Sequence, residues 1–99
     1  MKSQVEKIKR KIEPILGRFG VVKAALFGSY VTGTAKKSSD IDLLVKMKRG
    51  KSLLDIVGLK IELEELLGKR VDIITYNSLH PLLKKNILDE QEIFYEEKS

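Results

Sequence analysis

Three aspartates and one glycine–serine pair are the residues of this chain best suited to chemistry on a phosphate group. Gly28 and Ser29 directly follow an apolar run, and Asp40 and Asp42 open a second apolar run ten residues later. A third apolar run carries Asp72. Carboxylates are the hard oxygen ligands that Mg²⁺ prefers, and glycine lets the backbone come close to a ligand. Together these residues predict a site that binds metal ions and a phosphorylated substrate.

The spacing of the aspartates predicts that they share one rim of a sheet. Side chains alternate between faces along a strand, so Asp40 and Asp42 point one way while Ile41 points into the core. Asp72 joins them if its strand lies beside theirs, although alone it could equally be a structural strand residue. Three carboxylates repel one another, so we expect cations there. Two Mg²⁺ ions about 3.5–4 Å apart can bind both the attacking and the leaving oxygen of an in-line displacement at phosphorus.

The turn at Gly28 and Ser29 predicts phosphate binding. Ser29 supplies a hydroxyl and a main-chain N–H, and we expect it to begin a short helix toward Gly33, where helix starts favour anions. An ordinary strand-to-helix turn with a serine cap is the alternative for these residues alone. A Walker A loop is excluded because Thr34 stands where its lysine belongs. A G-x-G-x-x-G motif is also absent.

Composition predicts a single domain that spans residues 1–99. A chain of 99 residues can bury one modest core, and 42% hydrophobic with 33% charged residues is typical of a globular protein. The absence of cysteine excludes disulfides and thiolate metal sites. The longest apolar runs fall far short of the roughly 20 residues that span a bilayer. We therefore expect no membrane partner and a cytoplasmic location.

The net charge of +5 is unevenly distributed along the chain. Residues 1–50 carry 12 Lys and Arg against 4 Asp and Glu, whereas residues 51–99 carry 7 against 10. The basic half could attract phosphate, nucleic acid or an acidic partner, although the basic stretch from Lys2 to Lys11 fits a solvated helix face as well. Nucleic acid is the weakest of these readings, because the aromatic residues do not interleave with basic ones as in stacking platforms.

Hydrophobic periodicity predicts a two-layer α/β (α+β) fold with a short mixed sheet and helices packed on one face. Pro14 is expected to kink or split the first helix, and Ser52 and Asp55 are expected to cap the second. The expected helices cover about 5–19, 53–67 and 79–88, and the expected strands cover 21–27, 40–46, 71–76 and 93–95.

The order of these motifs resembles the DNA polymerase β-type nucleotidyltransferase superfamily. The strings LFGS and SDIDLLV, in so short a chain, look most like its minimal nucleotidyltransferase (MNT) family. The resemblance implies that Asp40 and Asp42 bind both magnesium ions. It implies that Asp72 completes the site of the ion that activates the attacking hydroxyl, and that Gly28 and Ser29 hold the triphosphate of ATP or another NTP.

One string departs from the family pattern. Many members carry arginines in a GSRARG-like sequence, whereas this chain reads GSYVTG, with Tyr30 and Thr32 at those positions. Arginine grips phosphate through two parallel hydrogen bonds, which neither residue can supply. Lys36 and Lys37 could compensate only loosely, so we expect a weaker hold on the triphosphate.

The resemblance implies a Mg²⁺-dependent transferase that moves a nucleoside monophosphate, expected to be AMP, from NTP to a hydroxyl. Larger members of the superfamily add a domain for the acceptor, and this chain has no room for one. The family implies that the acceptor is a helical HEPN protein, paired with this chain as toxin with antitoxin, whose ribonuclease activity is silenced by adenylylation of a tyrosine. Two alternatives stay open: a non-catalytic antitoxin that acts by binding its HEPN partner, and a basic nucleic-acid-binding module.

Overall fold

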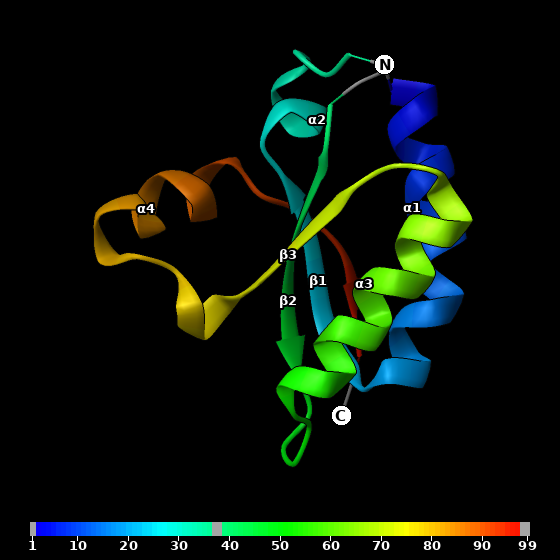
Figure 1. Ribbon diagram of the computed structural model, residues 1–99. Helices are drawn as coiled ribbons and strands as arrows, with labels where there is room; N and C mark the ends of the chain where they lie inside the picture. Colours follow the sequence, from blue (N-terminus) through cyan, green and yellow to red (C-terminus); the bar gives the residue numbers. More distant parts are fainter. Residues whose placement is uncertain (1, 37–38, 98–99) are drawn as a thin grey trace.

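The computed structural model describes residues 2–36 and 39–97, which form a mixed sheet with helices on both faces (Figure 1). No helix in these two segments is long and apolar enough to cross a membrane. In chain order the elements are α1 (Lys2–Leu16), the 3₁₀ turn η1 (Gly17–Phe19), β1 (Val21–Phe27), α2 (Ser29–Thr32), β2 (Ile41–Met47), α3 (Leu53–Leu67), β3 (Val71–Thr75), the 3₁₀ turn η2 (Tyr76–Ser78), α4 (Pro81–Glu90) and β4 (Glu92–Glu96).

The four strands are ordered β3-β2-β1-β4. β1 is antiparallel to both β2 and β4, whereas β2 and β3 are parallel. A parallel pair needs a crossover connection, which α3 provides. The expectation of a short mixed sheet is confirmed, and both central strands are largely apolar because they are covered from two sides.

The main core lies between the sheet and the helices α1 and α3, which cover one face together (Figure 1). Alternate strand residues supply the sheet side, as period-2 geometry requires. Its fully buried members include Ile12 and Leu16 from α1, Leu26, Ile41, Leu43 and Val45 from the central strands, and Leu59 and Leu63 from α3. The two-layer α/β prediction is therefore confirmed for this face.

The opposite face of the sheet carries a smaller apolar cluster. Ala25 and Leu44 are buried there against Leu79, with Ile87 and Leu88 of α4 packed around them. α4 thus lies across the sheet from α1 and α3 (Figure 1). This placement corrects the expectation that helices pack on one face only.

Pro14 was expected to kink or split the first helix, and the split does not occur, because α1 continues through Pro14 to Leu16. A proline near the end of a helix forfeits a single backbone hydrogen bond, and the buried side chains of Ile12, Ile15 and Leu16 hold this last turn against the sheet. The predicted cap of the next long helix is confirmed: the N–H of Ser52 donates to Asp55 Oδ2 over 2.8 Å.

Candidate active site

Two parallel strands bring the predicted aspartates to one end of the sheet. Asp42 on β2 is paired in register with Asp72 on β3, and neighbouring strands lie about 4.8 Å apart. The pairing is fixed just before the acids, where the N–H of Ile41 donates to the carbonyl of Arg70 over 2.9 Å. Asp40 precedes β2 by one residue and therefore shares the face of Asp42. We name Asp40, Asp42 and Asp72 the acid cluster.

The acid cluster is electrostatically strained while no cation is bound. Partial burial raises the pKa of the Asp42 carboxyl, and the nearby carboxylates of Asp72 and Asp40 raise it further. The direction of the shift is the one expected for a half-buried carboxyl with two acidic neighbours. As the side chains stand, no three His, Cys, Asp or Glu residues within 2–36 and 39–97 converge on a point that a metal ion could fill. The donor type and the mutual repulsion fit a hard divalent cation.

Gly28 brings the backbone against the acid cluster. It follows Phe27, which is paired with Asp42 across β1 and β2, and its φ of 77° with ψ of −149° is a conformation that glycine alone adopts readily. A Cβ built on Gly28 would collide with Oδ2 of Asp42. The glycine is therefore required both by its own dihedral angles and by the carboxylate beside it.

Ser29 begins the single-turn helix α2 and anchors the loop that follows. Its carbonyl accepts hydrogen bonds from the N–H groups of Gly33, Thr34 and Ala35 over 3.1, 3.0 and 3.1 Å. Its hydroxyl has no hydrogen-bond partner in the described part of the chain and is partly exposed. The first N–H groups of a helix also lack an intrahelical acceptor. Ser29 thus offers donors beside Asp42 that a phosphate could take.

The two residues at the positions where the family resemblance implies arginines lie in different surroundings. Tyr30 is only 3% exposed and packs in the main core, and its hydroxyl is buried without a partner among the described residues. Thr32 is exposed, and its hydroxyl lies 3.0 Å from that of Thr34. Lys36 is exposed, while the predicted contribution of Lys37 falls outside the described residues. Thr32, and not Tyr30, is therefore the position from which a side chain can reach a ligand.

Comparison with known proteins decides the family. The family model described as a nucleotidyltransferase domain matches residues 5–93, which is nearly the whole chain. This chain belongs to the nucleotidyltransferase domain family. The match contains all five predicted site residues, so the resemblance seen in the sequence is confirmed at the level of the family.

Relatives of this nucleotidyltransferase are named as protein adenylyltransferases. One from Methanocaldococcus jannaschii, named as a candidate enzyme of this kind, is 60% identical over 86 residues, covering 87% of this chain and 92% of the relative. Another, the protein adenylyltransferase MntA of Thermococcus cleftensis, is 47% identical over 73 residues, covering 74% of each chain.

Solved structures show the same fold. A candidate minimal nucleotidyltransferase superposes with a TM-score of 0.80 at 38% identity, covering 91% of this nucleotidyltransferase and 92% of the other chain. A complex of the tri-AMPylated HEPN toxin of Shewanella oneidensis with MNT antitoxin gives a TM-score of 0.58 at 20% identity, covering 95% and 68%. The second likeness concerns the fold alone. The predicted fold class is confirmed by the first.

Proposed function

We propose that this nucleotidyltransferase is a Mg²⁺-dependent protein adenylyltransferase that transfers AMP from ATP to a hydroxyl of a HEPN-type partner. The observation that carries the proposal is the pairing of Asp42 with Asp72 in a register that also sets Gly28 against Asp42. A carboxylate cluster beside a glycine turn combines cation ligands with the N–H and hydroxyl donors of Ser29. The names of relatives that share 60% and 47% identity support adenylyl transfer as the reaction.

Each site residue has a role that follows from its position. Asp40, Asp42 and Asp72 would hold two Mg²⁺ ions, and bound Mg²⁺ neutralises the charge that develops on phosphate oxygens. Gly28 lets the carboxylate of Asp42 lie against the backbone at the turn, and the hydroxyl and N–H of Ser29 would donate to the triphosphate. The acceptor oxygen bonds to the α-phosphorus, the bond from that phosphorus to the bridging β-oxygen breaks, pyrophosphate leaves, and the hydroxyl proton passes to solvent.

The partial exposure of the acid cluster supports the need for a partner. A hydroxyl substrate must be held in an oriented position to react quickly, and Asp40, Asp42 and Asp72 are all partly exposed. Large apolar side chains on the neighbouring α4 are exposed, including Leu82 at 83% and Leu83 at 54%. Exposed apolar patches of this kind often mark contacts with another protein. The HEPN identity of that protein, and the cytoplasm as its location, rest on the family resemblance.

The position of a label in ATP tests the class of reaction. The chain is mixed with its HEPN partner and Mg²⁺, with ATP labelled either at the α-phosphate or at the γ-phosphate. We expect the α-label to appear on the partner and the γ-label to appear only in pyrophosphate. Asp42→Asn is the matched inactive variant. A partner that binds stably but acquires neither label, although ATP binds, would instead favour the non-catalytic antitoxin.

A further inference from the structure

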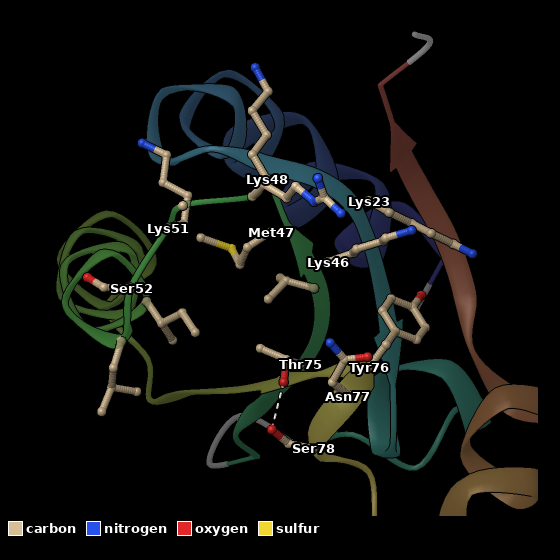
Figure 2. Close-up of a pocket in the computed structure, with 15 residues that line it drawn as sticks. Lys23, Lys46, Met47, Lys48, Lys51, Ser52, Thr75, Tyr76, Asn77 and Ser78 are labelled. Carbon is tan, nitrogen blue, oxygen red and sulfur yellow. Dashed lines mark hydrogen bonds between the residues drawn. The ribbon is translucent and has the colours of Figure 1, made fainter.

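A second site candidate lies at the other end of the sheet from the acid cluster. A groove of about 670 Å³ opens between the start of α3, the end of β2 and the turn η2 (Figure 2). Asp42 and Lys46 are four residues apart on β2, which places this groove about 13 Å along the strand from the acids. It is therefore separate from the proposed nucleotidyl-transfer site.

The groove is lined by cations without an acidic residue among its lining. Its basic members come from three segments of the chain: Lys23 of β1, Lys46 of β2, and Lys48, Arg49 and Lys51 of the turn after β2. Figure 2 shows Lys48 and Lys51 on one rim, Lys23 and Lys46 side by side on another, and Thr75, Asn77 and Ser78 across the opening. The arrangement surrounds one hollow with positive charge.

Two of these lysines are cross-strand neighbours of like charge. Lys23 and Lys46 are directly opposite on β1 and β2, and like charges in cross-strand pairs destabilise a sheet. The ammonium of Lys23 lies 5.1 Å from the centre of the Tyr76 ring, a cation–π contact that leaves its charge in place. Lys46 is exposed and has no ion pair among the described residues. A bound anion would relieve this repulsion.

Nearby acids compensate the groove only in part. Glu97 pairs with Lys48 over 3.5 Å, and Glu96 is in register with Lys23 on the other side of β1. The carboxylate of Asp55 is held by the N–H of Ser52, which lowers the pKa of Asp55. Arg49 and Lys51 have no ion pair within 2–36 and 39–97, so an excess of positive charge remains at the opening.

The size and the polar lining indicate the class of ligand. A volume of 670 Å³ lies inside the roughly 300–1,000 Å³ of small-molecule sites. Ser52, Thr75, Asn77 and Ser78 add hydroxyl and amide groups that can donate to phosphate oxygens, and Met47 and Ile56 give an apolar wall. We propose that this groove binds a phosphate ester of about nucleotide size, supplied either as a free nucleotide or as part of a single-stranded RNA.

Binding measured in EDTA separates this groove from the Mg²⁺-dependent site. Fluorescence anisotropy of the full chain uses a labelled short single-stranded RNA, and calorimetry uses ATP. The test variant is Lys46→Glu with Arg49→Glu; the matched control is Lys7→Glu with Lys11→Glu, which makes the same charge change at exposed positions of α1. We expect the test variant to lose at least about tenfold in affinity and to lower the salt slope for RNA by about 1.4, with the control within about twofold of the native chain.

Comparison of the two probes identifies the source of the phosphate. Tight binding of ATP would identify the ligand of the groove as a free nucleotide, whereas binding of RNA alone would identify it as a single-stranded RNA. Thermal melts establish that both variants fold, and Lys46→Arg with Arg49→Lys should retain binding because it keeps both charges. The assignment would be overturned if the test and control variants lost affinity equally, or if neither probe bound to the native chain. Equally strong competition by polyglutamate would also overturn it.

Discussion

The carboxylate of Asp42 occupies the space that a side chain at residue 28 would fill. Gly28 and Asp42 are therefore mutually dependent, because any larger residue at 28 must displace the acid. Gly33 has the same sign of φ, at 83°, but a Cβ there would meet no atom within 4 Å. The two glycines allow backbone strain to be separated from displacement of the acid.

Gly28→Ala should therefore reduce activity by more than its loss of stability explains. Both Gly28→Ala and Gly33→Ala should lower the free energy of unfolding by roughly 1–3 kcal/mol through strain at positive φ. Only Gly28→Ala should also cut the adenylylation rate about a hundredfold, since a shift of about 1 Å in a catalytic group can cost that much. Urea unfolding and initial rates measure the two effects. Equal rate losses in both variants would show that Asp42 is not moved.

Asp42→Asn should leave the metal-free chain as stable as the native chain, or slightly more stable, at neutral pH. The pKa of Asp42 is raised in the folded state, so its ionisation costs stability as pH rises through that folded-state pKa. The advantage of Asn should consequently vanish below the ordinary pKa of aspartate. Thermal melts in EDTA across acidic and neutral pH measure this. A large loss of stability at neutral pH would mean that Asp42 is structural.

Asp55→Asn is a control for which we expect the opposite pH dependence of stability. The N–H of Ser52 lowers the pKa of Asp55, so this carboxylate stabilises the fold above its ordinary pKa, and that stability is lost as pH falls through the lowered value. Asp55→Asn should therefore weaken the fold at neutral pH and have little effect in strong acid. Identical pH profiles for the two variants would contradict at least one of the two assignments, and the sign of the shared profile would show which.

Thr32→Arg should strengthen ATP binding in the presence of Mg²⁺. Of the two positions at which the family resemblance implies arginine, Thr32 is the exposed one. A charge-assisted contact is worth roughly 1.5–3 kcal/mol at best. A gain of about tenfold in affinity, or ~1.4 kcal/mol, is the expected result by calorimetry.

Tyr30→Arg provides the contrast to Thr32→Arg. Tyr30 is 3% exposed in the core, so arginine there would bury an unpaired charge and destabilise the fold by roughly 3–5 kcal/mol. Urea unfolding measures that loss. A stable Tyr30→Arg chain with tighter ATP binding would show that this side chain turns toward the phosphates.

The strands and the acid cluster were predictable because they depend on local pattern. Alternation fixed the faces of Asp42 and Ile41, and the observed register then required only that β3 lie beside β2. The direction of Tyr30 was not predictable, since a single-turn helix has too few residues to show a periodicity. The continuation of the helix through Pro14 was not predictable, because it depends on the buried residues around this proline.

Features that are built from distant segments of the chain could not be predicted from the sequence. α4 packs on the second face of the sheet because Leu79 contacts Ala25 and Leu44. No pattern in the sequence indicates this contact. The basic groove likewise joins Lys23, Lys46 and Lys51 from separate segments. In sequence these lysines look like ordinary surface charge, and only the cross-strand pairing shows that two of them face each other.

Intact-mass spectrometry of the chain mixed with its HEPN partner and Mg²⁺-ATP gives the most direct test of adenylyl transfer. We expect the partner to gain mass in steps of one AMP, while the nucleotidyltransferase keeps its own mass. Asp42→Asn should give no increment under the same conditions, although it still co-purifies with the partner. Stable complexes of the native chain in which neither protein changes mass, while ATP is bound, would contradict the assignment of adenylyl transfer.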